Sequence, residues 1–238
     1  MVNASENQCN DVLFSRYADD YWHIAEIFGL EAIYEGLAQD IFRTLPADAE
    51  KPRILDIGAG AGQNALPLLQ ANAHVHITLV DLSAEMMSHA RHILQAYADR
   101  ITLVTADIND YLLAATEPFT AVTSAFAIHN MQPTDRKRLF ESLPRVLKPN
   151  AVFVAFDKYA VADEVQHQKD LRSTTNKFAQ FTERGRPDLE QAWREHYVVD
   201  DAIRFTEAEQ TQLLHLAGFK KVKWMKRVGL EATVCGQT

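Results

Sequence analysis

The chain has 238 residues, of which 47% are hydrophobic and 24% charged, a length and composition that suit one folded domain. Its formal net charge of −8 disfavours a phosphate-rich partner such as DNA or tRNA, which a positive surface would usually meet. The polar N-terminus lacks the basic-then-apolar pattern of a secretion signal, and no run has the roughly 18 apolar residues of a membrane span. Cys9 and Cys235, the two cysteines, sit near opposite ends and favour a reduced environment. We expect a single domain over residues 1–238, cytoplasmic and without a membrane partner.

In chain order, two helical segments and a strand–helix alternation are predicted. Residues 10–45 are rich in aromatic residues and are expected to be helical. Short apolar runs then alternate with segments of helical periodicity; the runs cover residues 53–58, 76–82, 101–107, 119–126 and 151–157. This alternation predicts parallel strands joined by crossover helices that cover both sheet faces. Residues 160–200 follow near the carboxyl edge, where α/β sheets bind ligands, so we interpret 10–45 and 160–200 as helical covers over the pocket.

The end of the chain adds an antiparallel strand. A capping box at Thr206 begins the last predicted helix, and Gly218 ends it. Two strands follow, joined by a tight turn at Gly229, and two strands in direct succession cannot both run parallel to the sheet. Ser83 and Thr134 are expected to cap earlier helices. A basic cluster is interpreted as the solvated face of a half-buried strand, with an exposed nucleic-acid contact as the alternative; it comprises Lys220, Lys221, Lys223, Lys226 and Arg227. The predicted fold is a Rossmann-like, seven-stranded, mostly parallel α/β sheet.

Each of the first three predicted strands closes on an acid, one strand–helix unit apart. Asp56, Asp81 and Asp107 should therefore meet along the carboxyl edge of the sheet. A carboxylate at the position of Asp81 suits a ribose diol, because it accepts two hydroxyl hydrogen bonds. Asp107 is placed to accept from an exocyclic amine, and Asp56 to face a positive group near the glycine loop. The alternative for each acid alone is a helix cap or a turn former.

The loop "GAGAG" narrows the choice of ligand. A dinucleotide fingerprint fails when counted from Gly58, because the sixth position is Gln63. Counted from Gly60 it gives Gly60, Gly62 and Ala65, a weaker match that begins two residues late. A bare loop beside the acids fits a ribose and an amino-acid tail with no pyrophosphate, which together describe S-adenosylmethionine. A nicotinamide-dependent oxidoreductase remains the alternative from another class.

The segments "ILDIGAGAGQ", "ITLVDLSAEMM", "VTADIND" and "FTAVTSAFAIHNM" resemble the ordered motifs of class I S-adenosylmethionine-dependent methyltransferases. The resemblance covers roughly residues 10 to 238 and is greatest to small-molecule enzymes related to those of ubiquinone biosynthesis. It implies S-adenosyl-L-methionine as cofactor and S-adenosyl-L-homocysteine as product. The cofactor residues that it implies are Asp56, Gly58, Gly60 and Gly62 at the methionine part, Asp81 and Leu82 at the ribose, Asp107, Ile108 and Met86 at the adenine, and Ser124 and Ala125 below the methionyl group.

Methyl transfer from a sulfonium is an in-line displacement, so the main task is to align the acceptor and exclude water. A base is needed only if the acceptor nucleophile carries a proton. His129, just past the fourth strand, is the candidate catalytic base, and Asn130 is a candidate for orienting a polar acceptor. Relatives often carry His-His here, and a structural role for His129 is the alternative. We expect a small-molecule acceptor methylated at oxygen, nitrogen or carbon; the alternatives are tRNA, a protein, or a cofactor-binding protein without activity.

Aromatic residues in the two covers are candidates for closing the site. Tyr17 and Tyr21 are four residues apart and share a helical face, in a segment that resembles the helix folding over the cofactor in related enzymes. Either ring would favour a sulfonium cation. In the second cover, Trp193, His196 and Tyr197 are candidate acceptor-pocket residues. Ordinary packing is the alternative for all of them.

Two histidine pairs have spacings that occur in metal sites. They are His74 with His76 and His89 with His92. No third ligand is apparent in the sequence near either pair, so we interpret these histidines as structural or solvated and expect no metal.

Overall fold

The computed structural model describes residues 13–47 and 49–238; the prediction for residues 10–12 and for Cys9 lies outside them. A seven-stranded sheet has the order β3-β2-β1-β4-β5-β7-β6. Its strands are β1 (Arg53–Ile57), β2 (His76–Asp81), β3 (Ile101–Thr105), β4 (Phe119–Ala125), β5 (Leu147–Lys158), β6 (Lys223–Val228) and β7 (Glu231–Gln237). None of the helices in the described part of the chain has the length and hydropathy that a bilayer crossing needs.

The five strands β1 to β5 run parallel, and β7 is antiparallel to both of its neighbours, β5 and β6. The predicted antiparallel addition at the end of the chain is therefore confirmed. Strand order reverses between β1 and β4, which creates a crevice at their carboxyl ends. The central strands are buried on both faces, as their nearly continuous apolar sequences require.

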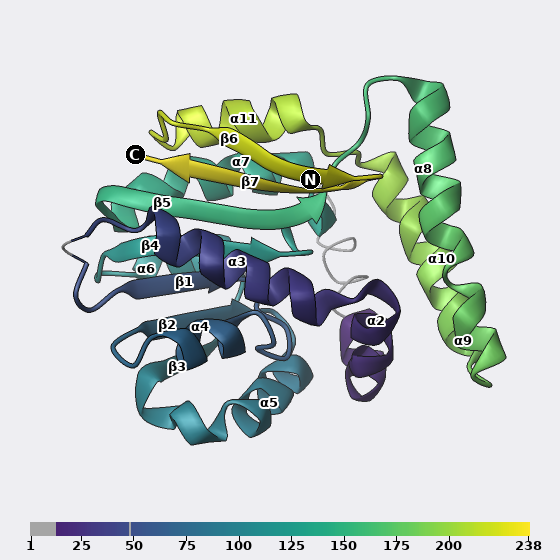
Figure 1. Cartoon of the computed structure of the whole chain (residues 1–238), viewed down its shortest axis with the longest axis horizontal. Coiled ribbons are helices and arrows are strands. Elements are labelled where there is room, and N and C mark those ends of the chain that lie inside the picture. Colours follow the sequence, from purple (N-terminus) through teal and green to yellow (C-terminus); the bar gives the residue numbers. More distant parts are fainter. Residues whose placement is uncertain (1–12, 48) are drawn as a thin grey trace.

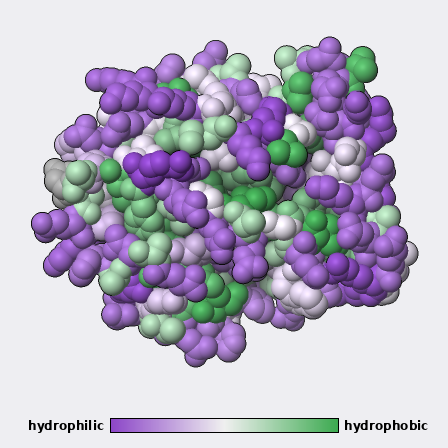
Figure 2. Space-filling model, in the orientation of Figure 1, coloured by the Kyte–Doolittle hydropathy of each residue, from purple (hydrophilic) through white to green (hydrophobic). Residues whose placement is uncertain are grey.

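Helices cover both faces of the sheet (Figure 1). One core cluster packs α3 (Leu30–Thr44), α4 (Ala65–Ala71) and α5 (Ala84–Ile93) on one face. The other packs α6 (Ile108–Ala114), α7 (Pro133–Ser142) and α11 (Glu207–Leu216) on the opposite face. Hydrophilic side chains cover most of the surface seen in Figure 2, with smaller apolar groups between them. The fold is therefore the three-layer α/β arrangement that the sequence predicts.

Two of the three residues predicted to cap the starts of helices do so. Ser83 accepts from the backbone N–H of Met86, and Thr206 accepts from that of Glu209, as expected of N-caps. The prediction for Thr134 was wrong, because Pro133 occupies the first helical position of α7, so that the N-cap is Gln132, two residues earlier.

Two strand predictions also needed correction. Strand β5 begins at Leu147, four residues before the predicted start, because Leu147 pairs with Phe119 ahead of an irregularity in the register. The basic strand β6 is mostly exposed rather than half-buried, since it lies at the sheet edge and its register shifts between Trp224 and Lys226.

The two predicted covers pack against each other beyond the carboxyl ends of the strands (Figure 1). The first contains α2 (Tyr21–Phe28) and precedes α3; the second contains α8 (Glu164–Asn176), α9 (Ala179–Glu183) and α10 (Pro187–Ala202). An apolar cluster joins Tyr17 and Ile24 of the first cover to Phe178, Trp193 and Tyr197 of the second. Ion pairs between Asp20 and Arg186 and between Glu26 and Arg184 join them at the surface.

Candidate functional site

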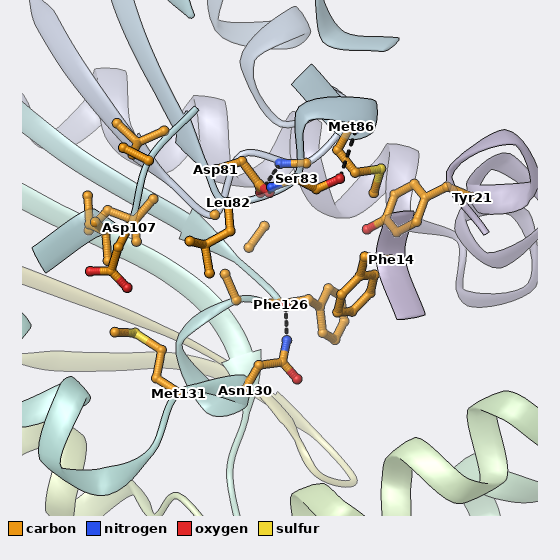
Figure 3. Close-up of a pocket in the computed structure, with 18 residues that line it drawn as sticks. Phe14, Tyr21, Asp81, Leu82, Ser83, Met86, Asp107, Phe126, Asn130 and Met131 are labelled. Carbon is orange, nitrogen blue, oxygen red and sulfur yellow. Dashed lines mark hydrogen bonds between the residues drawn. The ribbon is translucent and has the colours of Figure 1, made fainter. Parts of the chain in front are cut away.

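A cavity lies at the carboxyl edge of β1, β2 and β4 and is closed on one side by Phe14 and Tyr21 of the N-terminal cover (Figure 3). We call it the first cavity. Ten predicted site residues line it: Gly58, Gly60, Asp81, Leu82, Met86, Asp107, Ile108, Ala125, Tyr21 and Asn130. The fold thus brings together residues from five segments of the chain, from Tyr21 in the N-terminal cover to Asn130 after β4.

Asp81 ties the glycine loop to the end of β2. Its Oδ2 accepts from the backbone N–H of Gly60 at 2.8 Å, and its Oδ1 accepts from that of Ser83 at 2.9 Å. The side chain lines the first cavity beside Leu82 (Figure 3). It is therefore held in a fixed position at the cavity wall.

Two glycines of the loop are required for different structural reasons. Gly58 has a φ of +63°, and a Cβ there would meet the Cβ of Ala127 at 2.3 Å. Gly62 has a φ of +78°, and a Cβ there would meet Leu94 Cδ1 at 2.8 Å. Gly58 therefore permits close approach of the loop that follows β4, whereas Gly62 permits α5 to pack. Gly62 is not among the residues lining the first cavity.

Replacing Gly58 by alanine should destabilise the protein by about 1–3 kcal/mol more than replacing Gly185, which has a similar φ of +79° and open space around it. Both variants meet the same backbone strain, but only Gly58→Ala adds a clash with Ala127. Urea unfolding of the two variants measures the difference. Equal losses of stability would show that the close approach at Gly58 has no energetic weight.

Asp56 is buried beside the loop. Its Oδ1 accepts from Asn64 Nδ2 at 3.0 Å, while its Oδ2 has no hydrogen-bond partner. Burial raises the pKa of Asp56 to about 7, against the opposing effect of the Asn64 hydrogen bond. The side chain lines a small recess that shares Tyr21, Gly58, Gly60 and Ala125 with the first cavity. An unpaired carboxylate oxygen is costly in such a position and favours a cationic partner.

Asp107 has two roles. Its Oδ1 accepts from the backbone N–H groups of Asn109 at 2.7 Å and Asp110 at 3.3 Å, so it caps α6 as the alternative interpretation required. It also lines the first cavity together with Ile108. The three acids thus end neighbouring strands and lie on or beside one cavity.

Two predicted cofactor residues point elsewhere in the structure. Ser124 is fully buried and donates to the carbonyl oxygen of Ile57 at 3.0 Å, which joins β4 to β1. Tyr17 packs on Trp193 with ring centroids 5.9 Å apart and belongs to the cluster between the covers. Neither lines the first cavity. Their contribution to a ligand site would be indirect.

A second cavity adjoins the first and carries the remaining predicted residues. Its lining comprises Phe14, Tyr21, Ile24, Phe28, Leu30, Phe126, His129, Asn130, Trp193, His196 and Tyr197. Four of these residues, Phe14, Tyr21, Phe126 and Asn130, also line the first cavity. The candidate base His129 and the three candidates of the second cover therefore face one aromatic space.

His129 is held by an acid that the sequence analysis missed. Its Nδ1 contacts Asp157 Oδ1, and its backbone N–H donates to Asp157 Oδ2 at 3.2 Å. Its Nε2 lies 3.6 Å from Asp200 Oδ2. Burial and Lys158 disfavour a charged ring, but Asp157 and Asp200 outweigh them and raise the pKa of His129. The imidazole is fixed in orientation and stabilised as a cation.

Other lining residues were also missed. Phe14 of the N-terminal cover and Phe126, which has a φ of +54°, line both cavities. The aromatic content of the cover was visible in the sequence, but the inward direction of Phe14 was not. Asp157, the last residue of the fifth predicted run, repeats the strand-end acid pattern and was the available signal for the histidine's partner.

A parallel sheet of this order, with a glycine loop and acids along its carboxyl edge, defines a nucleoside-binding α/β protein. A family model described as a methyltransferase domain matches residues 54–150. Over 187 residues the chain is 25% identical to the carboxy-S-adenosyl-L-methionine synthase of Campylobacter concisus, covering 78% of this chain and 76% of that protein. Over 97 residues it is 37% identical to the ubiquinone/menaquinone biosynthesis C-methyltransferase UbiE of Syntrophotalea carbinolica, covering 41% and 40%.

Solved structures have the same fold. The magnesium protoporphyrin IX methyltransferase of Synechocystis, solved with S-adenosylhomocysteine, has a TM-score of 0.64 at 12% identity over 98% of this chain and 99% of that one. An O-methyltransferase family protein from Burkholderia thailandensis has a TM-score of 0.67 at 13% identity over 92% of this chain. The chain spans 58% of the length of the latter. Residues 54–150 thus match a methyltransferase domain, and the chain is an enzyme with S-adenosylmethionine as its cofactor.

Proposed function

We propose that this enzyme methylates a small, flat acceptor bound in the second cavity. The observation that carries the proposal is the shared wall between the two cavities, which places an aromatic space directly beside the cofactor space. Aromatic side chains bind flat molecules by stacking and apolar burial. Residues of both covers line this space and the covers pack on each other, so it suits a small molecule better than a folded macromolecule.

The residues of the first cavity fit S-adenosylmethionine. We assign the ribose hydroxyls to Asp81, whose oxygens are held at the cavity wall by two backbone donors. The adenine would lie between Met86 and Ile108, with Asp107 accepting from its amine. The unpaired Asp56 Oδ2 suits the ammonium of the methionine part. Tyr21, which lines both cavities, would stand at the sulfonium.

The affinity for S-adenosylmethionine should increase as pH rises towards about 7, because only the ionised Asp56 attracts an ammonium. The raised pKa means that the folded protein without ligand favours the neutral carboxyl of Asp56. The contribution of Asp56 to the free energy of unfolding therefore falls as pH rises from 3.8 towards about 7. A bound ammonium stabilises the ionised Asp56 carboxylate and so reverses the preference for the neutral form. Calorimetry across this interval should show the rise in the wild type and a flat, weaker response in Asp56→Asn. The same slope in both proteins would assign the effect to another group.

The chemistry follows from where the side chains stand. Bound S-adenosylmethionine supplies a methyl group on a good leaving group. The second cavity holds the acceptor in line and excludes water, and Asn130 is positioned between the cavities to orient a polar atom. His129 takes the proton of an acceptor hydroxyl or amine through Nε2, because its Nδ1 is engaged with Asp157. A proton-bearing oxygen or nitrogen is therefore the favoured atom.

A macromolecular acceptor has less support. The basic residues of β6 lie at the sheet edge, with β7 and β5 between them and β4. Arg227 is paired with Glu207. The net charge of −8 also disfavours a phosphate-rich acceptor, and no lysine or arginine of the described residues lines either cavity.

The similarity to carboxy-S-adenosyl-L-methionine synthases raises a second candidate, the formation of a carboxylated cofactor. Such a product carries an added carboxylate, which a buried site would match with lysine or arginine. No lysine or arginine lines the first or second cavity in the described part of the chain. The geometry therefore favours methyl transfer to an acceptor.

The test is a transfer assay with S-adenosylmethionine labelled at its methyl group. Phenols and aromatic amines are compared with bulk tRNA and unfolded protein as acceptors, and the nucleoside product is identified by mass. The proposal requires label in a small aromatic molecule together with S-adenosylhomocysteine. Label in tRNA or protein alone, or a cofactor gaining the mass of a carboxyl group, would overturn it.

A further inference from the structure

A group of buried titratable side chains lies behind the second cavity, where three segments meet. We call it the charge cluster: His129 from the turn η3 (Ile128–Asn130), Asp157 and Lys158 from β5, and His196 and Asp200 from α10. All five are less than a tenth exposed. The insertion helix thus supplies two members of a cluster that otherwise belongs to the sheet edge.

The members contact one another directly. Lys158 Nζ contacts Asp200 Oδ2 and lies 3.6 Å from the ring centroid of Tyr197. His196 Nε2 lies 3.2 Å from the same Asp200 oxygen, and His129 Nε2 lies 3.6 Å from it. Asp200 is therefore the common partner of one ammonium and two imidazoles, and its Oδ1 has no hydrogen-bond partner.

Charge balance assigns one proton to His129. The cluster has two carboxylates and a single ammonium, so one more positive charge makes it neutral. Burial lowers the pKa of His196 to about 4, although Asp200 opposes this, and His196 is neutral near pH 7. The pKa of His129 is raised by its two carboxylates. Other titratable groups also interact with the cluster: Arg136 and Tyr159 with Asp157, Tyr197 with Asp157 and Asp200, and Glu231 of β7 with Lys158. Burial raises the pKa of Glu231 and so favours its neutral form.

A third cavity begins on the other side of this cluster. Its lining combines the charged or titratable Lys158, Asp200, His167, Asp201 and Arg204 with apolar residues such as Leu171 and Phe205. His129 and Tyr197 line both the second and the third cavity. The imidazole therefore stands in a wall between the acceptor space and the third cavity, and Asp200 lines the third cavity.

The ligand atoms of His129, His196 and Asp200 lie within 4.8 Å of one another, a spacing that a metal ion also accepts. Lys158 already supplies the cation at the shared Asp200 oxygen. A divalent ion in addition to the ammonium would leave the buried cluster with excess positive charge. The arrangement therefore favours a proton over a metal.

We propose that Asp200 is a positioning residue that holds the transferred proton on His129 and directs it into the third cavity. This rests on the proposed function of His129 as base. As the acceptor's oxygen or nitrogen bonds to the methyl carbon, the carbon–sulfur electron pair goes to sulfur. The ring of His129 first gives up its Nε2 proton and is then neutral. The acceptor's proton goes to this Nε2, which faces Asp200 Oδ2, and the imidazolium that forms releases it through the third cavity to solvent. The enzyme returns to its starting charge after each turnover.

The test is an NMR titration of isotope-labelled histidine in the full chain with S-adenosylhomocysteine, which needs no acceptor. Asp200→Asn should lower the pKa of His129 by about one unit or more, because it removes a carboxylate close to the ring. Lys158→Met should raise it, because the ammonium opposes the imidazolium. Glu195→Gln, an exposed change on the same helix whose carboxylate contacts Gln191, is the matched control and should leave it unchanged.

Opposite shifts in the two variants support the proposal, and a purely structural role would not reverse sign between them. Unchanged or parallel shifts would overturn it, as would Zn²⁺ binding to the wild type with micromolar affinity that Asp200→Asn abolishes. With an active acceptor, Asp200→Asn should also move the acid limb of the kcat profile to lower pH and reduce its plateau. If the NMR shifts appear while His129→Gln keeps full activity, the proposed role of His129 as base is wrong. The effect of Asp200 on the pKa of His129 is then still confirmed.

Discussion

Replacing Asp81 by alanine is expected to weaken S-adenosylmethionine binding by about 100-fold or more. The carboxylate would accept from the ribose and at the same time fixes Gly60 and Ser83. Each hydrogen bond to a charged group contributes about 1.5–3 kcal/mol, so the loss of two is sufficient for this effect. Isothermal calorimetry with S-adenosylmethionine and S-adenosylhomocysteine measures it directly.

The matched control is Asp110→Ala, an exposed acid in the first turn of α6 that does not line the first cavity. It should bind both nucleosides as the wild type does. Asp81→Asn should be intermediate, because the amide preserves the shape of the side chain but keeps only one acceptor oxygen. If Asp81→Ala binds normally while Asp110→Ala does not, the ribose has been assigned to the wrong strand.

Replacing His129 by glutamine should lower kcat by about 10²–10⁴-fold and leave S-adenosylhomocysteine binding unchanged. The imidazole lines the second cavity and is absent from the lining of the first, so cofactor affinity should not depend on it. In the wild type the raised pKa means that the ring must lose its proton before it acts as base. Activity should therefore rise with pH through the folded pKa, and glutamine should remove that limb.

His215→Gln, an exposed change in the last turn of α11, controls for the loss of a histidine. It should retain activity and the full pH profile. Loss of cofactor binding in His129→Gln would identify the residue as a structural support for the loop after β4. Full activity would mean that the acceptor needs no base and is methylated as an already deprotonated or neutral nucleophile.

The fold and the first cavity could be predicted because their signals are local. Each strand–helix unit places its acid at the same edge, so Asp56, Asp81 and Asp107 converge once the strands are parallel. Glycine spacing then distinguishes one cofactor class from another. The start of α7 was predicted wrongly because Pro133 at the first helical position outweighed the capping signal of Thr134. The start of β5 was predicted wrongly because Leu147 pairs with Phe119 ahead of a register irregularity that the apolar pattern does not indicate.

The charge cluster could not be predicted in the same way. Asp200 lies 71 residues after His129 in a helix whose docking depends on contacts between two covers. No periodicity indicates which face of α10 meets Lys158. Phe14 and Phe126 were missed for a related reason, since an aromatic residue in a helix or loop gives no signal of its direction.

A crystal structure of the enzyme with S-adenosylhomocysteine would test the assigned cofactor site most directly. We expect ribose hydroxyls within about 3 Å of the Asp81 carboxylate and the amino group at Asp56 Oδ2. The sulfur should face the second cavity, on the side of His129 and Tyr21. A nucleoside that contacts neither acid, or a sulfur directed away from the aromatic cavity, would contradict it.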